Sequence, residues 1–352
     1  MNRKTIDERI KWLFSINKEH SDEFVRSRSL RQIYRVEHPT EICAFKCMDG
    51  RIHIPVVTNT PLGIIRPYRN IGGYFDLGWP LLGEDLTEWV NYAISKARKS
   101  LILVTYHFSE GDKHRGCAGF DYDCQAAFDF TVNYFKQVNR LFGANNQVVF
   151  PIVIGLETDT DSLIFHPQNP TQKEGIFRCA SETPVDPEYL MEIIGNLYPD
   201  MDPKVRGDLL PLILGNIAHI KKIKEQGRDL TDMQHSEWVL GVGRGFDWMH
   251  ESNTALIVGP YSPDLSEPII RAAGIIQNNM KSGCIPDDGF LVLLSAPFRD
   301  RGVDENRARE KALFFKKYVK KIIEENYPDL LSKAKFIAVT IDEHTRRANI
   351  IE

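Results

Sequence analysis

The feature that most constrains the fold is an alternation between wholly apolar runs and amphipathic stretches. Residues 101–106 (LILVTY) and 148–156 (VVFPIVIGL) are continuous apolar runs, which are typical of strands buried on both faces of a parallel sheet. Between them, residues 122–142 carry apolar side chains at helical spacing: Ala127, Phe130, Tyr134, Val138 and Leu141. Strands that alternate with helices in this way predict an α/β sheet with helical crossovers.

Other segments extend the pattern in both directions. Thr5 and Glu8 have the spacing of a capping box, which predicts the start of a helix. We expect further helices at 21–34, 85–98 and 304–325, and further strands at 41–46, 62–65, 254–258, 289–295 and 336–341. Residues 186–230 are helical and polar in pattern, and we interpret them as a connection between two halves.

The two halves resemble each other. Residues 103–108 (LVTYHF) match 293–298 (LLSAPF), and 152–160 (IVIGLETDT) match 337–345 (IAVTIDEHT). In this alignment His107 stands opposite Pro297, and the strand that leads to Cys47 stands opposite the one ending at Gly259. Any two βαβ units share some likeness, but the order and spacing of the matched pieces favour a degenerate duplication. The second half has no counterpart of a Cys after the His position.

Length and charge set broad limits on the protein. A chain of 352 residues can form two domains or one large one. Its net charge of −4 gives no general reason to bind nucleic acid or an anionic membrane. No apolar run approaches the roughly 18 residues of a membrane span. The N-terminus mixes charges among its apolar residues, unlike a signal peptide, so we expect an intracellular protein.

Cysteine usage points towards metal binding. The chain has six cysteines, at 43, 47, 117, 124, 179 and 284, and no secretory signal, which favours free or metal-bound thiols over a disulfide framework. Cys47 and His107 each follow an apolar run, and Cys117 comes ten residues after His107. Two thiols and an imidazole at strand ends predict a zinc site. Three protein ligands leave a fourth position for water, as in catalytic zinc sites.

Two other motifs admit simpler interpretations. Residues 157–161 (ETDTD) alternate acids as a calcium loop does, but they lack the Gly and terminal Glu of an EF-hand, so we interpret them as a loop after a strand. Gly241-x-Gly243-x-Gly245 does not fit the dinucleotide-binding pattern, and we interpret it as a flexible bend.

The motifs taken together resemble a known family. C-x-D-x-R at 47–51, R-N-x-G-G at 69–73, and a strand that ends in His with a Cys beyond it resemble the β-class carbonic anhydrases. Residues 106–109 (YHFS), 114–118 (HRGCA) and 154–161 (IGLETDTD) look most like the carboxysome shell carbonic anhydrases, a divergent branch of that class. The resemblance covers roughly residues 31–352.

The resemblance implies an α/β architecture: a β-carbonic-anhydrase-like sheet with helical crossovers, duplicated as a catalytic half and a degenerate, metal-free half. We therefore expect an N-terminal helical arm (1–30), a zinc-binding catalytic domain (31–185), a helical connection (186–230) and a degenerate C-terminal copy (231–352). The halves are expected to pack as a pseudo-dimer. Whole chains are expected to form homo-oligomers, as dimers or a multiple of them.

The resemblance also implies a zinc lyase that hydrates CO2 reversibly to bicarbonate and a proton. Cys47, His107 and Cys117 would bind Zn²⁺, Asp49 would orient the attacking oxygen, and Arg51 would keep Asp49 ionised. Most β-class enzymes use an H-x-x-C pair, which His114 and Cys117 would satisfy. However, the ligand His of that class lies at a strand end, which favours His107. His114 is then a rim residue or a proton carrier.

Alternative functions and locations stay open at this level. The same zinc site could hydrolyse CS2 or COS, or the zinc could be structural in a non-catalytic assembly protein. Carboxysome shell enzymes carry a long N-terminal helical region linked to packaging and Rubisco, whereas about thirty residues precede the catalytic part here. We expect a cytoplasmic or carboxysomal protein, and shell or Rubisco association is left open. No nucleic acid or membrane partner is expected.

Overall fold

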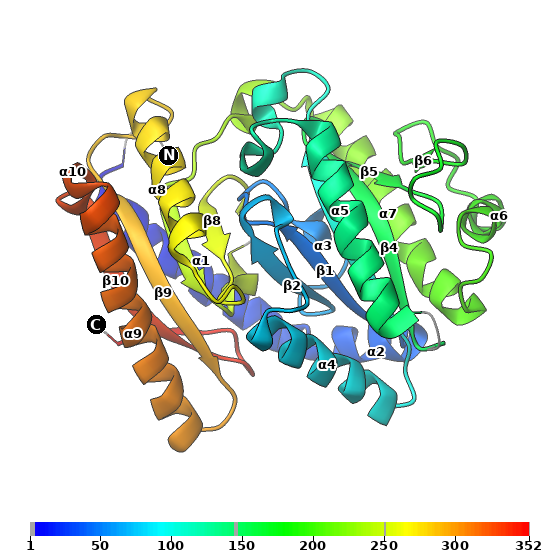
Figure 1. The fold of residues 1–352 in the computed structure, drawn as a ribbon, viewed down its shortest axis with the longest axis horizontal. Helices are drawn as coiled ribbons and strands as arrows, with labels where there is room; N and C mark the ends of the chain where they lie inside the picture. Colours follow the sequence, from blue (N-terminus) through cyan, green and yellow to red (C-terminus); the bar gives the residue numbers. More distant parts are fainter. Residues whose placement is uncertain (1–3, 144–146, 250, 352) are drawn as a thin grey trace. The chain divides into compact units, whose positions relative to one another are not determined.

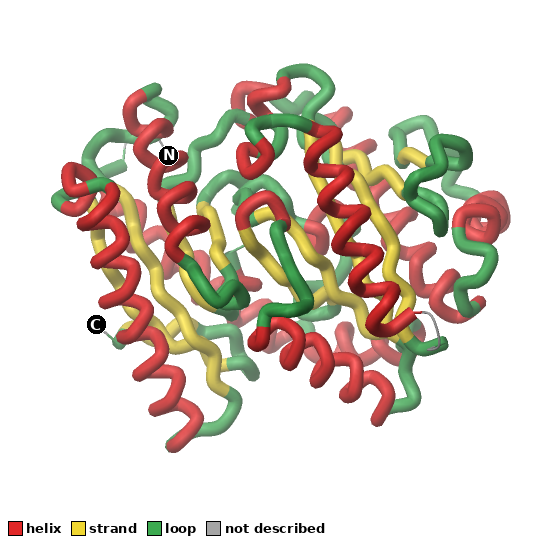
Figure 2. Tube along the Cα trace, viewed as in Figure 1, coloured by secondary structure: helices red, strands yellow, loops and turns green. Residues whose placement is uncertain are grey.

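The computed structural model describes residues 4–143, 147–249 and 251–351, so Met1–Arg3 of the expected N-terminal arm lie outside it (Figures 1 and 2). The chain forms two compact units. The central unit comprises Leu30–Cys47 and Ile52–Met233. The terminal unit comprises the residues before Leu30, the short segment Met48–Arg51, and the residues from Gln234 onwards.

The central unit is built on one sheet of the order β2-β1-β3-β4-β5-β6. Its first four strands are parallel, and β5 and β6 are antiparallel to their neighbours. The strands are β1 (Glu41–Cys47), β2 (Ile65–Asn70), β3 (Ser100–Phe108), β4 (Val149–Glu157), β5 (Ser162–Phe165) and β6 (Phe177–Arg178). The helices that accompany them are α2 (Arg28–Glu37), α3 (Ile54–Val57), α4 (Pro80–Ser95), α5 (Cys124–Val138), α6 (Pro187–Leu197) and α7 (Pro203–Gln226).

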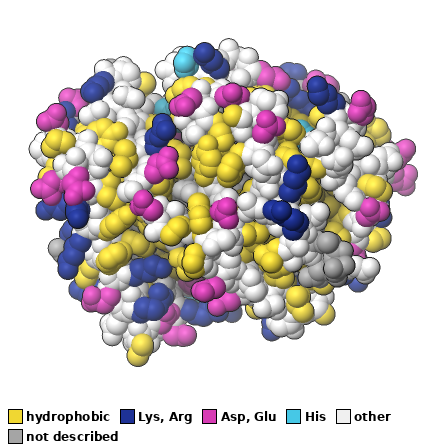
Figure 3. Space-filling model, viewed as in Figure 1, with side chains coloured by type: hydrophobic (Ala, Val, Ile, Leu, Met, Phe, Trp, Pro, Cys, Tyr) yellow, Lys and Arg dark blue, Asp and Glu magenta, His cyan; other side chains and the backbone are white. Residues whose placement is uncertain are grey.

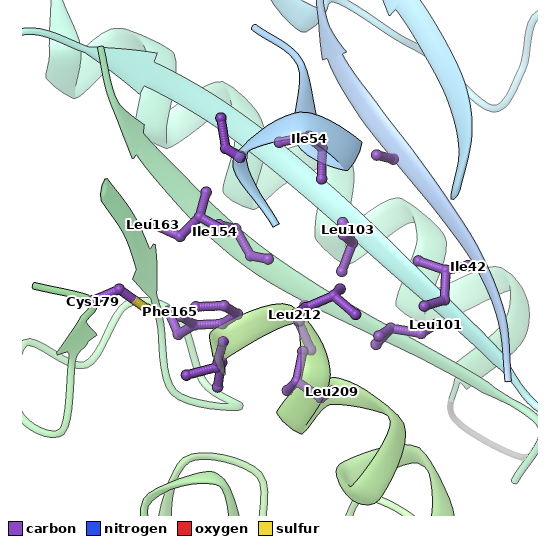
Figure 4. Close-up of a cluster of buried hydrophobic side chains, with 14 of the residues drawn as sticks. Ile42, Ile54, Leu101, Leu103, Ile154, Leu163, Phe165, Cys179, Leu209 and Leu212 are labelled. Atoms are coloured by element: carbon purple, nitrogen blue, oxygen red, sulfur yellow. The ribbon is translucent and has the colours of Figure 1, made fainter. Parts of the chain in front are cut away.

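Both faces of this sheet are covered, which explains the continuous apolar runs. Alternate side chains of a strand point to opposite faces. On one face, Leu101 and Leu103 of β3 join a buried cluster with Leu209 and Leu212 of α7 (Figure 4). On the other face, α5 packs on β3 and β4, and its Tyr134 contacts the ring of Phe45 at 4.9 Å between centroids. The sheet therefore lies between two helical layers.

The terminal unit is built on a second sheet, of the order β11-β10-β9-β7-β8. Its strands are β7 (Val239–Gly243), β8 (Ala255–Val258), β9 (Phe290–Phe298), β10 (Ala334–Asp342) and β11 (Ala348–Ile350). Its helices are α1 (Ile6–Arg26), α8 (Ser266–Lys281), α9 (Val303–Asn326) and α10 (Pro328–Leu331). In Figure 1, α8 and α9 lie in front of this sheet and α1 passes behind it.

The N-terminal helix is anchored to the C-terminal part of the chain. The predicted capping box is present: Thr5 and Glu8 cap each other at the start of α1. Arg9 is buried and pairs with Asp288 at 2.5 Å. Asn17 donates to the carbonyl of Arg346 and accepts from the backbone amide of Ala348. Helix α1 is therefore part of the terminal unit.

The two sheets share one topology, which confirms the α/β fold and supports the expected duplication. In each sheet the first strand lies between the second and the third, the fourth follows, and a fifth strand pairs antiparallel with the fourth. His107 and Pro297 are each the next-to-last residue of the third strand, as the sequence alignment placed them.

One detail of that alignment was wrong. The counterpart of β1 is β7, whereas Thr254–Val258 contributes the second strand, β8. Gly241 and Gly243 belong to β7 rather than to a flexible bend. Glycine is uncommon inside strands, so the sequence did not indicate one here, yet β7 pairs in parallel with β8 and β9. Following the strand registers, the position of Cys47 in the first sheet is taken by Arg244 in the second.

Most expected elements are present with shifted boundaries. Strand β2 begins at Ile65, where the expected strand 62–65 ends. Residues 61–64 form a turn instead, closed by the amide of Ile64 on the carbonyl of Pro61. Helix α4 begins at Pro80, five residues before the expected start, because proline suits the first turn of a helix.

Acidic and basic side chains are interspersed over the face drawn in Figure 3, in keeping with a small net charge of −4. In the described ranges, no helix combines the length and the apolar character needed to cross a lipid bilayer.

Candidate metal centre

The topology of the central sheet creates a natural site at the carboxyl ends of β1 and β3. These two strands are neighbours, but the chain leaves β1 towards β2 on one side and reaches β3 on the other. Crossovers that diverge in this way leave a crevice outside the strand ends, where ligands of α/β proteins bind. Cys47 is the last residue of β1, and His107 is the next-to-last residue of β3.

Three potential metal ligands converge there. The ligand atoms of Cys47, His107 and Cys117 all lie within 4.8 Å of one another. All three residues are buried, with 6%, 2% and 4% of their surfaces exposed. The two strand ends deliver Cys47 and His107, and the loop after β3 folds back to deliver Cys117.

The donor set fits zinc. The sulfur atoms of Cys47 and Cys117 are 3.9 Å apart. Two zinc–sulfur bonds of about 2.3 Å at a tetrahedral angle would separate them by about 3.8 Å, whereas a disulfide needs about 2.05 Å. Within the described residues the group has three members, and three protein ligands are the number found in catalytic zinc sites.

His114 lies apart from this group. It is exposed, in the short 3-10 helix η2 (Lys113–Arg115), and its ring packs edge-on against Tyr122. The strand end, rather than the H-x-x-C spacing, therefore brings a histidine to the two cysteines.

The R-N-x-G-G motif lines the same edge of the sheet. Asn70 ends β2 directly beside Cys47 in the strand register. Its side-chain amide donates to the carbonyl of Tyr74 and holds the following turn, η1 (Ile71–Gly73). Gly72 has a φ of 57°, and a Cβ on Gly119 would lie 2.6 Å from the Gly72 Cα. The glycines thus allow η1 to pack against the segment that follows Cys117.

Asp49 and Arg51 form a compact buried ion pair in the terminal unit. The guanidinium of Arg51 donates to both carboxylate oxygens of Asp49, at 3.0 Å from Nε and 2.6 Å from Nη2. The backbone amide of Arg51 also donates to Asp49, at 2.8 Å. A carboxylate held by three donors has one orientation.

Two residues that the sequence analysis did not select complete this cluster. His235 lies with Nε2 3.0 Å from Arg51 Nη2 and Nδ1 3.0 Å from a carboxylate oxygen of Glu237. Glu237 is fully buried and also accepts from the backbone amide of Gly50. In the sequence, these two residues are marked only by a His-x-Glu pair whose Glu lies two residues before the start of an apolar strand.

The charges of the neighbouring residues in this cluster shift the pKa values of His235 and Glu237. Burial by itself would lower the pKa of His235, but the carboxylates of Glu237 and Asp49 outweigh burial and the opposing Arg51 charge, and that pKa is raised. Burial favours a higher pKa for Glu237, but the neighbouring His235 dominates and lowers it. The arrangement therefore favours a charged Glu237 that accepts from His235 Nδ1, while His235 Nε2 accepts from Arg51.

Asp49, His235 and Glu237 also have the spacing of a metal site. However, Arg51 Nη2 lies 2.6 Å from Asp49 and 3.0 Å from His235. The guanidinium supplies the positive charge at this place, so we interpret the cluster as an ion-pair network.

The molecule is thus an α/β protein with two sheets of one topology and a candidate centre of two cysteines and one histidine at the carboxyl ends of β1 and β3. Residues 38–176 match the family model of the carboxysome shell carbonic anhydrase catalytic domain. This match confirms the family resemblance drawn from the motifs, and it includes every member of the candidate centre.

Two curated proteins are similar over a longer stretch. The carboxysome shell carbonic anhydrase of Prochlorococcus marinus subsp. pastoris is 26% identical over 238 residues, which cover 59% of this chain and 46% of that protein. The one from Parasynechococcus marenigrum is 25% identical over 238 residues, 59% of this chain and 40% of that protein. The chain thus spans less than half the length of these relatives.

Proposed function

We propose that this protein is a zinc-dependent carbonic anhydrase that interconverts CO2 with bicarbonate and a proton. The observation that carries the proposal is the convergence of Cys47, His107 and Cys117 within 4.8 Å at the carboxyl ends of β1 and β3. The match of the surrounding residues to a carbonic anhydrase catalytic domain supports it.

The three ligands would hold the metal and leave one coordination position open. When bound there, Zn²⁺ would lower the pKa of a water molecule to about 7, which makes a nucleophile available at neutral pH. The protein would hold the ligands deprotonated and in place, because Cys47 and His107 lie on rigid strand ends of the sheet.

Asp49 and Arg51 would orient the reacting oxygen. Asp49 follows Cys47 by two residues, and we assign its carboxylate the role of accepting a hydrogen bond from the reacting oxygen. Arg51 holds this carboxylate through its side chain and backbone. His235 and Glu237 in turn hold Arg51 in position. The exposed His114 would pass the released proton to buffer.

The decisive experiment combines metal analysis with stopped-flow CO2 hydration. We expect about one zinc per chain and hydration well above the buffer rate at pH 8. Cys47→Ser and His107→Ala should abolish both, whereas His114→Ala should keep the zinc. Zinc-replete protein that does not hydrate CO2 would contradict the proposal. If that protein hydrolysed COS or CS2, it would be a hydrolase; if it hydrolysed neither, the zinc would be structural.

We also propose that the protein works in association with a carboxysome and as a homo-oligomer. Support for the location comes from the two curated relatives, which are carboxysome shell carbonic anhydrases. Co-purification with intact carboxysomes tests the location. Light scattering at micromolar concentration tests the assembly, for which a monomer would be the contradicting result.

A further inference from the structure

The acidic run Glu157–Asp161 begins at the last residue of β4, and its side chains form hydrogen bonds to the loop that carries Cys117. That loop, Ser109–Cys117, follows β3, which is the neighbour of β4 in the sheet. The two segments therefore leave the same edge of the sheet side by side. Cys117 ends this irregular loop rather than a strand, so contacts outside the sheet must determine where its sulfur lies.

The carboxylate of Asp159 contacts the loop at three points. One oxygen accepts from the Ser109 hydroxyl at 2.8 Å and from the backbone amide of Gly111 at 3.2 Å. Both oxygens accept from the Arg115 guanidinium, at 2.6 Å and 2.8 Å. Asp159 is 8% exposed. One buried side chain thus connects the start of the loop with the residue two positions before Cys117.

The surrounding contacts reinforce this arrangement. The hydroxyl of Thr158 lies 3.0 Å from the carbonyls of both Phe108 and Arg115. A Cβ on Gly111 would lie 2.6 Å from the Arg115 guanidinium and 2.7 Å from the Asp159 carboxylate, so glycine leaves the space that the ion pair occupies. Burial raises the pKa of Asp159, but the hydrogen bonds from Arg115 and Ser109 outweigh it and the net shift is downwards.

We propose that Asp159 is a positioning residue of the metal centre: by holding Ser109, Gly111 and Arg115, it places the Cys117 sulfur beside Cys47 and His107. This inference rests on the proposed zinc site. Groups that orient metal ligands from outside the coordination sphere typically change metal affinity by about 10–100-fold when they are removed. Asp159 is not a member of the three-residue group itself and acts on the Cys117 loop through hydrogen bonds.

The chain offers a matched control two residues away. Asp161 is also buried, and it also accepts from an arginine, Arg228, at 2.6 Å. Its second partner is His219 of α7 at 2.9 Å. Asp161 therefore has the residue type, burial and ion pairing of Asp159, but its carboxylate binds His219 of α7 and Arg228, and neither of these belongs to the Cys117 loop.

The test compares Asp159→Asn with Asp161→Asn in the full-length protein. Zinc affinity is measured by competition with a chromophoric chelator, and Co²⁺ substitution reports ligand geometry through the sulfur-to-cobalt charge-transfer bands. We expect Asp159→Asn to weaken zinc binding by about 10–100-fold and to alter the cobalt spectrum. We expect Asp161→Asn to retain both the affinity and the spectrum of the wild type, and Asp159→Glu to recover part of the loss.

Each result has a defined meaning. Equal zinc affinities for the wild type and Asp159→Asn, or equal losses for Asp159→Asn and Asp161→Asn, would overturn the positioning role while leaving the proposed function intact. Wild-type protein that binds no zinc would overturn both. If Asp159→Asn fails to fold, Ser109→Ala removes one bond to the same carboxylate and keeps the ion pair. A loss of zinc affinity with an unchanged thermal midpoint of the metal-free protein would support the role. Unchanged affinity would oppose it.

Discussion

The sulfur atoms of Cys47 and Cys117 lie 3.9 Å apart, although 70 residues separate the two cysteines along the chain. Cys47 comes from the end of β1, and Cys117 comes from the loop after β3. This separation is close to that of two thiolates on one tetrahedral zinc, at about 3.8 Å. The spacing of the two sulfur atoms, with His107 beside them, therefore suits a shared metal ion.

Removal of one sulfur should release the metal. We expect Cys117→Ser to weaken zinc binding by at least about 100-fold, because even indirect partners of metal ligands change affinity by 10–100-fold. Hydration of CO2 should fall to the buffer rate. Elemental analysis after dialysis against a weak chelator measures the first effect. Cys124→Ser, a change at an exposed cysteine at the start of α5, is the control; full zinc retention by Cys117→Ser would exclude Cys117 as a ligand.

Asp49→Asn should separate orientation from metal binding. An amide of the same shape can donate where the carboxylate only accepted, and it loses the charge that pairs with Arg51. We expect the zinc content to stay near one per chain and kcat to fall by about 100-fold or more. Stopped-flow hydration with parallel zinc analysis measures both. Asp300→Asn, at an exposed aspartate, serves as the control, and a wild-type kcat for Asp49→Asn would show that this carboxylate has no part in the reaction.

Glu237→Gln should destabilise the terminal unit. The substitution leaves Arg51 and His235 buried with less compensating negative charge. Removing one partner of a buried ion pair lowers the free energy of unfolding by about 3 kcal/mol or more. Urea unfolding in the presence of a chelator measures the free energy of unfolding, and Glu225→Gln changes an exposed glutamate of α7 as the control. The double variant with His235→Gln should lose less than the sum of the two single losses; strict additivity would argue against the pairing.

Stability should depend on pH through His166. This histidine is 5% exposed and its Nε2 lies 3.0 Å from the Tyr106 hydroxyl. Burial lowers its pKa from 6.5 to about 4. As the pH falls, the unfolded chain therefore takes up the proton first, and unfolding becomes more favourable below about 6.5 until the folded state also protonates near 4. The loss reaches about 3 kcal/mol at most.

Urea unfolding at pH 7.5 and pH 5, with chelator present throughout, tests this dependence. His166→Gln should remove the His166 contribution, so the difference in unfolding free energy between the variant and the wild type should change between the two pH values. The exposed His344→Gln should leave that difference constant. A difference that is the same at both pH values for His166→Gln would mean that this residue titrates normally in the folded protein.

Much of the fold could be predicted because segments that are buried in the fold consist mainly of apolar residues. The runs 101–106 and 148–156 are apolar throughout since each forms a central strand covered on both faces, and both strands are present as β3 and β4. Prediction failed at β7, where Gly241 and Gly243 lack the side chains by which a strand is recognised. Pairing with β8 and β9, which the sequence does not display, makes those residues a strand.

The order of residues was enough to indicate that Cys47 and His107 would share one edge of a sheet, because the carboxyl ends of neighbouring parallel strands meet there. It also placed Asp49 and Arg51 close enough along the chain to pair. The position of Cys117 beside them depends on the folded chain, since a loop can fold in many ways until contacts such as those of Asp159 hold it. The same is true of His235, which contacts Arg51, and of Glu237, which contacts Gly50, each across more than 180 residues of chain. No local pattern in the sequence indicates a contact at that separation.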